Sequence, residues 1–176
     1  MDQAFRGSIN IAMEYYIVAL LLMLGTGGVC FYRKRSISVS VRWAFLIGYL
    51  FLIYSSTVIT RDMGEEYDYD FHLFWSYITA WKKGRMDLLY LNIANVIMLL
   101  PVGFFVGCIG ITGCKWAMLV GVGVSGVIEV SQLVLKRGMF EFDDIFHNAL
   151  GCVLGYLVYR GVKWVDEKKK GVSKNN

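Results

Sequence analysis

The chain consists of long apolar runs separated by short polar stretches. Five runs approach the length of about 20 residues that a helix needs to span a bilayer core. They are about Ile9–Tyr32, Trp43–Ile59, Leu89–Ile111, Trp116–Leu135 and Asp144–Tyr159. Alternation with a period of two does not recur, which argues against a membrane β-barrel. The pattern predicts an all-α integral membrane bundle of about five transmembrane helices.

The long polar stretch between the second and third runs contains a helical stripe of large apolar side chains. Its members are Phe71, Phe74, Trp75, Ile78 and Trp81. Such a stripe predicts an amphipathic helix that lies in the membrane interface. This helix would act either as a lid over a pocket or as an aromatic anchor.

The first run is followed, rather than preceded, by its basic cluster at residues 33–35. A cleaved signal peptide has basic residues in front of its apolar run and a small-residue cleavage site behind it. We therefore expect the first run to be a retained anchor.

Composition agrees with a membrane protein and excludes other classes. Of 176 residues, 56% are hydrophobic and 18% are charged, whereas a soluble domain has about 25% charged residues. High hydrophobicity excludes a disordered chain, and four cysteines are too few for a disulfide-stapled mini-protein. A soluble enzyme could not bury this much apolar surface.

The basic residues predict the orientation of the five runs. With the N-terminus outside, the inner side holds eleven of the 18 Lys and Arg residues, within 33–42, at 115 and within 160–174. Cytoplasmic loops carry such an excess, and twelve of the 14 acidic residues then lie outside or near the outer face. Cys30, Cys108 and Cys114 fall on the inner side, as expected of thiols that stay reduced in the cytoplasm.

The runs and this orientation divide the chain into a membrane hairpin (1–59), an outer loop with three spans (60–160) and a basic cytoplasmic tail (161–176).

Polar residues inside the spans mark candidate chemistry, because such groups are costly in a bilayer. Asn95, Glu129 and Asn148 fall at a similar depth near the outer side, on three different helices. Residues three or four apart share a helix face, which predicts one shared outward-facing pocket. The candidate residues are Arg61, Asn92, Asn95, Glu129, Gln132, Arg137, Asp143, Asp144 and Asn148. The alternative is interhelical hydrogen bonding, with one buried ion pair between Glu129 and Arg61 or Arg137.

Glycines recur within three of the runs, at 103 and 107, at 121, 123 and 126, and at 151 and 155. The set at 121–126 imitates a dinucleotide-binding pattern, but no strand precedes it. Close helix packing through small residues is the better interpretation of all three sets.

Several of these residues together resemble the VanZ-like family. The stretch 128–132 (Ile-Glu-Val-Ser-Gln), Arg137 and the stretch 143–151 (Asp-Asp-Ile-Phe-His-Asn-Ala-Leu-Gly) match its pattern. The stretch 92–104, with two asparagines before Leu-Pro-Val-Gly-Phe, and Thr60–Arg61 are also similar. The resemblance implies a multi-pass protein of the bacterial cell membrane that lowers susceptibility to teicoplanin-type glycopeptides.

Three functions are consistent with the predicted pocket. In the first, the pocket recognises an outer-leaflet lipid, a cell-wall lipid precursor or a glycopeptide antibiotic. Arg61 and Arg137 would then hold an anionic group, and the other ligand-binding candidates, Asn92, Asn95, Gln132, Asp143 and Asn148, would complete the pocket.

In the second, Glu129 is a general acid or base, with Asp144, in an enzyme acting on a lipid-linked substrate. The third is a small transporter. Asp143, Asp144 and His147 form an alternative metal site; otherwise we predict no metal, no cofactor and no nucleic-acid partner.

Overall fold

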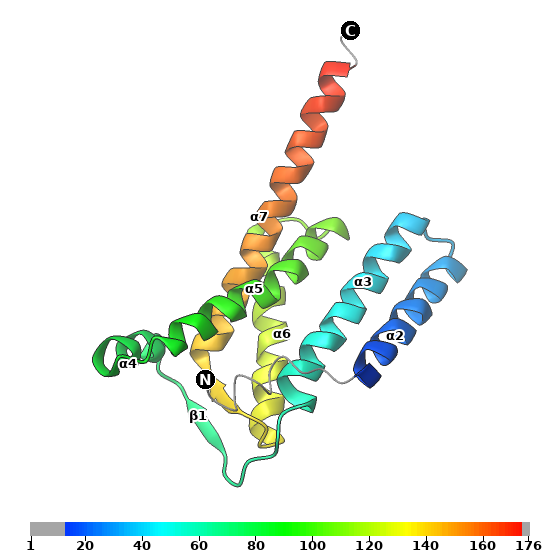
Figure 1. Ribbon diagram of the computed structural model, residues 1–176. Coiled ribbons are helices and arrows are strands. Elements are labelled where there is room, and N and C mark those ends of the chain that lie inside the picture. Colours follow the sequence, from blue (N-terminus) through cyan, green and yellow to red (C-terminus); the bar gives the residue numbers. More distant parts are fainter. Residues whose placement is uncertain (1–12, 174–176) are drawn as a thin grey trace.

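A computed structural model of the protein describes the backbone of residues 13–173 and the side chains of residues 13–170. Its elements in chain order are α2 (Met13–Tyr32), α3 (Ile37–Tyr54), the π-helical turn η1 (Ser55–Ile59), β1 (Asp68–Asp70), α4 (Trp75–Lys83), α5 (Asp87–Cys108), α6 (Cys114–Val134), β2 (Met139–Glu141) and α7 (Phe142–Ser173) (Figure 1). The fold is all-α apart from one short strand pair. Arg6 and Lys174, which contributed to the predicted orientation, lie outside the described residues.

Four helical segments within residues 13–173 are long and apolar enough to cross a membrane. They are Met13–Tyr32, Ile37–Ile59, Asp87–Cys108 and Cys114–Val134. The fifth predicted run, 144–159, lies in the first half of the 32-residue helix α7, which is not among the four. Its passage through the membrane therefore stays a prediction.

Helices α5 and α7 pack closely because glycines remove the side chains between them. A Cβ at Gly103 would overlap the backbone of Cys152, and one at Gly155 would overlap the backbone carbonyl of Leu100. Close packing is therefore confirmed here, and also at Gly121, where a Cβ would lie 2.8 Å from the Cα of Ala149 in α7. The prediction of close packing is wrong for the two other glycines of the 121–126 set, Gly123 and Gly126, because no described atom lies within 4 Å of a Cβ there.

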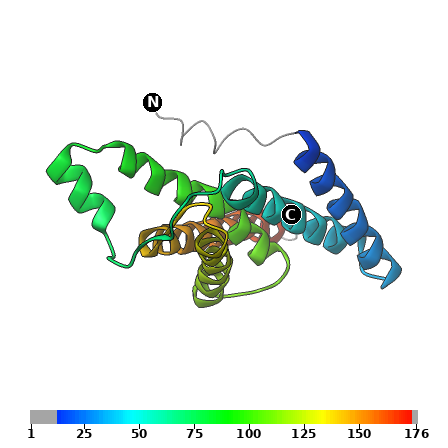
Figure 2. The same ribbon diagram turned by 90° about the horizontal axis from the view of Figure 1, so that it is seen from below.

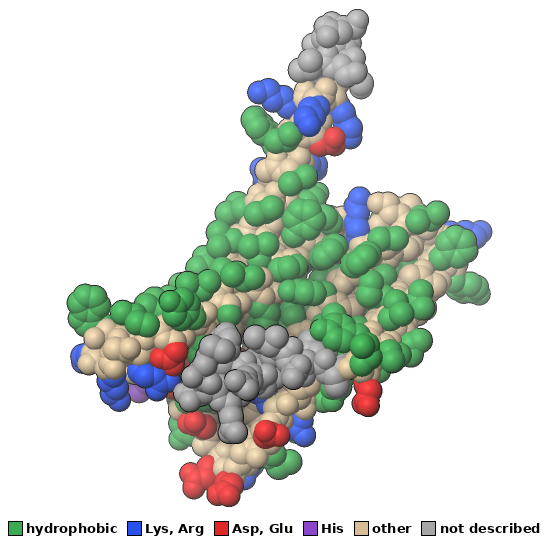
Figure 3. Space-filling view, in the orientation of Figure 1, with side chains coloured by type: hydrophobic (Ala, Val, Ile, Leu, Met, Phe, Trp, Pro, Cys, Tyr) green, Lys and Arg blue, Asp and Glu red, His purple; other side chains and the backbone are tan. Residues whose placement is uncertain are grey.

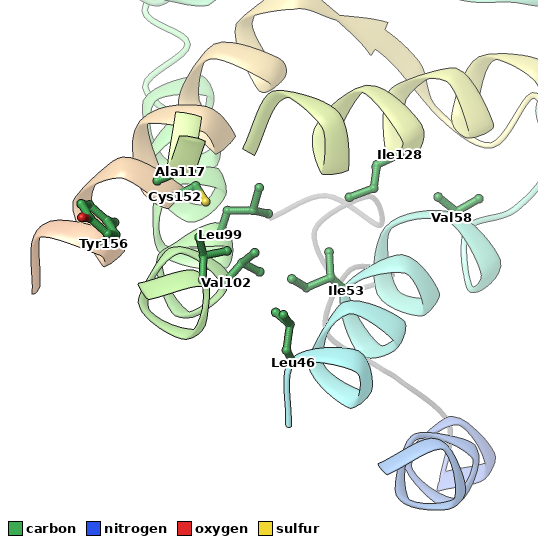
Figure 4. Close-up of a cluster of buried hydrophobic side chains, with 10 residues drawn as sticks. Leu46, Ile53, Val58, Leu99, Val102, Ala117, Ile128, Cys152 and Tyr156 are labelled. Atoms are coloured by element: carbon green, nitrogen blue, oxygen red, sulfur yellow. The ribbon is translucent and has the colours of Figure 1, made fainter. Parts of the chain in front are cut away.

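Helices α5, α6 and α7 form a three-helix unit, and the core lies where α3 and η1 meet this unit (Figure 4). Leu46, Ile53 and Val58 approach the buried side chains of α5 and α6. The Tyr49 hydroxyl donates to the carbonyl of Met98 at 2.9 Å, which adds a polar link between α3 and α5. Helix α2 lies outside this unit and packs against α3 (Figure 2); Ala19 is its buried side chain.

Charged groups separate toward the two ends of the bundle, with a broad apolar surface between them (Figure 3). The turn between α2 and α3 carries Arg33, Lys34 and Arg35, and lies at the same end as the C-terminal half of α7. The opposite end carries the acidic segment 62–70 and the β strands. The lower end in Figure 1 is called the acidic end below, and the upper end the basic end.

At the acidic end, β1 and β2 form a two-stranded parallel ladder that pairs Asp68 with Met139 and Asp70 with Glu141. This ladder ties the segment that follows η1 to the start of α7. Helix α4 forms within the predicted region, and it buries the small side chains of Ser76 and Ala80 while Trp81 is 88% exposed. The position of α4 in a membrane interface stays a prediction.

Candidate functional site

Gln132 and Arg137 satisfy backbone carbonyls at the end of η1. Gln132 Nε2 donates to the carbonyl of Thr57 at 3.0 Å. Arg137 Nη1 donates to the carbonyl of Ile59. A helix C-terminus leaves carbonyls without internal partners and attracts positive charge. These two side chains therefore fix the end of η1, and with it the position of Arg61 two residues later.

Asp143 holds the start of α4 rather than facing the other carboxyl groups. Its Oδ1 accepts from the backbone N–H of Phe74, and its Oδ2 accepts from the backbone N–H and the hydroxyl of Ser76, at 3.1 and 2.5 Å. Asn92 Nδ2 donates to the same Ser76 hydroxyl at 2.9 Å. Asp143 is fully buried and acts as an N-terminal cap provided by another helix.

His147 is bound on both ring nitrogens, which argues against the alternative metal site. Nδ1 lies 2.6 Å from the backbone carbonyl of Asp143, and Nε2 lies 2.7 Å from the Tyr77 hydroxyl. Within residues 13–173, no group of three or more His, Cys, Asp or Glu residues is arranged to hold a metal ion. The polar atoms of Asp143, Asp144 and His147 are directed to different partners, so the arrangement does not support the alternative metal site, which stays a prediction.

The central cluster consists of Arg61, Asn95, Glu129 and Asp144, from four segments of the chain. Glu129 is 1% exposed, and its Oε2 accepts from the backbone N–H of Glu141 at 3.0 Å. Asp144 Oδ1 accepts from Asn95 Nδ2 at 2.6 Å. Arg61 lies within electrostatic range of both carboxyl groups.

Gly138 makes room for the Arg61 side chain. Its φ of 151° is unfavourable for other residues, and a Cβ at this position would lie 2.7 Å from Arg61 Nη1. The glycine after Arg137 is therefore required both by the backbone turn and by the guanidinium that lies against it.

The charged groups of the central cluster converge without closing into an ion pair. Within the described part of the chain, no ion pair shorter than 4.0 Å joins Glu129 to Arg61 or Arg137, so the predicted alternative of a buried pair is wrong. Each carboxyl group has one oxygen fixed by an internal donor. The second oxygen of each, and the Arg61 guanidinium, keep hydrogen-bonding capacity for another group.

Glu141 belongs to the same region, although it is not among the site residues predicted from the sequence. Its Oε2 accepts from Trp75 Nε1 at 3.0 Å. Burial, and then the charge of Asp144, raise the pKa of Glu141 to about 8. Ser76 was likewise missed; its four-residue spacing to Ala80 among large apolar side chains is the signal that could have identified the buried face of α4.

Asn148 lies one helical turn beyond Asp144, deeper in the bundle. Its Nδ2 donates to the hydroxyl of Ser125 at 2.8 Å, and Ser125 lies one turn from Glu129 on α6. Asn148 Oδ1 is buried without a hydrogen-bond partner within residues 13–173. The structure thus brings together Arg61, Asn95, Glu129 and Asp144, whereas the other predicted ligand-binding residues take part in neighbouring contacts.

The fold and this cluster describe a helical protein of membrane type with buried carboxyl groups near one end. The VanZ/LLP1 family matches residues 37–164, which include every residue of the central cluster. The chain belongs to this family. No curated protein and no solved structure matches it.

Proposed function

We propose that this VanZ-type membrane protein binds the polar head group of an amphiphile at the central cluster and contributes to glycopeptide resistance of the teicoplanin type. The amphiphile is an outer-leaflet lipid, a lipid-linked cell-wall precursor or the glycopeptide itself. Family membership supports the membrane role. The arrangement of Arg61, Glu129 and Asp144 supports the binding role.

One observation carries the proposal: Arg61 lies within electrostatic range of two buried carboxyl groups, Glu129 and Asp144, yet pairs directly with neither. A guanidinium beside two carboxyl groups normally forms bidentate hydrogen bonds with one of them. Here Asn95 and the backbone of Glu141 hold the carboxyl groups instead. The remaining oxygens accept from hydroxyl or amine groups, and the guanidinium donates to a phosphate or carboxylate. A head group that carries both kinds of group fits this combination.

The proposed orientation places the central cluster on the outer side of a bacterial cell membrane. The N-terminus is outside, the first half of α7 is the fifth span and the C-terminal tail is cytoplasmic. The basic residues 33–35 and the lysines of the α7 tail lie at the end opposite the acidic segment 62–70, which supports this orientation. An outer-leaflet ligand then reaches the cluster without crossing the bilayer.

The test compares Arg61→Gln and Glu129→Gln with wild type in cells exposed to teicoplanin. Both substitutions keep approximate shape and remove one charge at the cluster. We expect both to abolish protection while the amount of protein in the membrane is unchanged. Binding of a fluorescent teicoplanin, and of a lipid-linked cell-wall precursor, to the purified protein identifies which amphiphile is held.

Glu66→Gln is the matched control, because Glu66 is an exposed acid of the same end of the molecule. It removes the same charge as Glu129→Gln, and we expect it to leave protection intact. Full protection by both cluster variants would contradict the proposal. Equal loss in all three variants would assign the effect to the charge of the surface rather than to the cluster.

A second candidate function is hydrolysis or group transfer on a lipid-linked substrate. The observation that favours it is that two carboxyl groups within electrostatic range of each other lie in different surroundings, Glu129 buried against a backbone N–H and Asp144 held by Asn95. Such pairs divide acid and base roles. Incubation of the purified protein with a lipid-linked cell-wall precursor distinguishes the two functions, because only the enzyme releases a product.

A further inference from the structure

The C-terminal half of α7 extends beyond the rest of the bundle at the basic end (Figure 1). The Tyr156 hydroxyl accepts from the backbone N–H of Gly113 at 2.7 Å, so the turn between α5 and α6 lies level with Tyr156. Exposed apolar side chains continue along α7 to Val162, which is 57% exposed. With the first half of α7 crossing the membrane as proposed, the residues after Val162 lie at the level of the lipid head groups.

One face of this extension is neutralised by its own ion pairs. Lys163 lies 3.8 Å from Glu167, and Lys170 lies 2.6 Å from Asp166. Each pair spans one helical turn. The two acids of the segment are therefore matched with two of its lysines.

The other face carries basic and apolar side chains without acids. Trp164, Val165, Lys168 and Lys169 lie together on this face. Trp164 is 62% exposed and Val165 is 44% exposed. Neither Lys168 nor Lys169 forms an ion pair within the described residues.

The direction of these side chains brings their charge toward the membrane. Side chains on a helix lean toward its N-terminus, and the N-terminus of α7 is on the bundle side. The Lys168 ammonium lies 5.3 Å from the centre of the Trp164 ring, one turn closer to the apolar surface than its own backbone. This geometry matches lysines that extend toward lipid phosphates beside an interfacial tryptophan.

We propose that the face formed by Trp164, Val165, Lys168 and Lys169 binds anionic phospholipid head groups of the adjacent leaflet. Two unpaired ammonium groups supply the complementary charge, and Trp164 supplies the contact at the interface. A basic segment next to a span attracts anionic lipids at about 1 kcal/mol for each lysine. An acidic protein partner is disfavoured, because the face begins within one turn of the apolar surface and lipids surround it there. This inference rests on the proposed passage of the first half of α7 through the membrane, and it concerns the end of the molecule opposite the central cluster.

The test uses the full-length protein in phosphatidylcholine vesicles that contain spin-labelled phosphatidylglycerol or spin-labelled phosphatidylcholine. Electron paramagnetic resonance gives the association of each lipid with the protein. We expect wild type to prefer phosphatidylglycerol, and Lys168→Gln with Lys169→Gln to reduce that preference, by up to about fivefold for each lysine. Higher salt should weaken the preference of wild type, because these charges are exposed.

Lys163→Gln with Lys170→Gln is the matched control, since it changes the net charge of the same segment by the same amount on the ion-paired face. We expect this variant to keep most of the preference. Equal loss in the two double variants would overturn the proposal in favour of the general charge of the tail. Absence of any preference in wild type, with or without capture of a soluble partner, would also overturn it.

Discussion

At the scale of single residues, neighbouring carboxyl groups have different tasks. Asp143 and Asp144 are adjacent in the chain, yet Asp143 accepts hydrogen bonds from the start of α4 and Asp144 accepts one from Asn95 on α5. Side chains of successive helical residues point about 100° apart. Of the two adjacent aspartates in the family-like pattern, Asp143 therefore makes a structural contact and Asp144 belongs to the central cluster.

Substitution of Asp143 by alanine should release α4 from the bundle. The change leaves two backbone N–H groups and the Ser76 hydroxyl without a charged acceptor. Such hydrogen bonds contribute about 1.5–3 kcal/mol each when charge-assisted. We expect a loss of about 4–5 kcal/mol in unfolding free energy, the lower end of this range summed over the three hydrogen bonds, and faster tryptic cleavage at Lys82 and Lys83, measured on protein in detergent micelles.

Asp87→Asn provides the comparison for this experiment. Asp87 pairs with Arg85 at the surface, at 2.6 Å, and exposed pairs contribute little to stability. Asp87→Asn should therefore leave the unfolding free energy and the rate of tryptic cleavage close to those of wild type. Unchanged proteolysis of the Asp143 variant would show that α4 is held by other contacts.

At the scale of elements, the contact between α5 and α7 depends on glycines that allow the two backbones to approach. Gly103, Gly151 and Gly155 each face a backbone atom of the opposite helix. In a membrane, close backbone approach replaces much of the hydrophobic drive that packs soluble helices. This contact positions Asn95 on α5 against Asp144 on α7.

Gly155→Ala should separate α5 from α7 and destabilise the bundle. The added methyl group overlaps the backbone around Leu100, which a change of side-chain rotamer does not relieve. Overpacking of this kind costs about 1–3 kcal/mol. Thermal unfolding in detergent measures the expected loss.

Gly123→Ala is the matched substitution on α6, because no described atom lies within 4 Å of its added methyl group. It should be neutral or stabilising, since alanine favours helix more than glycine does. If both substitutions destabilise the bundle equally, packing of α5 against α7 is not the cause.

At the scale of the whole molecule, the two ends of the bundle differ in charge: the acidic segment 62–70 lies at one end, and residues 33–35 and the lysines of the α7 tail lie at the other. Helices α2, α3, α5, α6 and α7 alternate in direction between these ends (Figure 1). The native thiol of Cys114 is exposed at the basic end, and Glu66 is exposed at the acidic end. These two positions report on the proposed orientation.

Labelling with a membrane-impermeant maleimide tests that orientation. With the basic end in the cytoplasm, wild type should be labelled only after cells are permeabilised, whereas Glu66→Cys should be labelled in intact cells. Cys114→Ser shows which thiol gives the wild-type signal. Labelling of wild type in intact cells, without labelling of Glu66→Cys, would reverse the proposed orientation.

The sequence by itself determined the helical class, the family and most members of the candidate site. Apolar runs about 20 residues long specify helices, because the backbone in a bilayer must satisfy its own hydrogen bonds. Intramembrane polar residues such as Glu129 and Asn95 are detectable in sequence because they are rare and costly there. The same pattern cannot show which of them face one another, since spacing gives the face of one helix and not its neighbour.

The tertiary structure decided which of those polar residues form the central cluster and which make neighbouring contacts. The contact of Gln132 and Arg137 with η1 depends on a π-helical turn that the apolar pattern does not reveal. The ladder of β1 with β2 joins segments about 70 residues apart, and it brings Glu141 beside Glu129. Long-range packing therefore selected Arg61, Asn95, Glu129 and Asp144 from the larger predicted set, because only packing sets the distances between side chains on different helices.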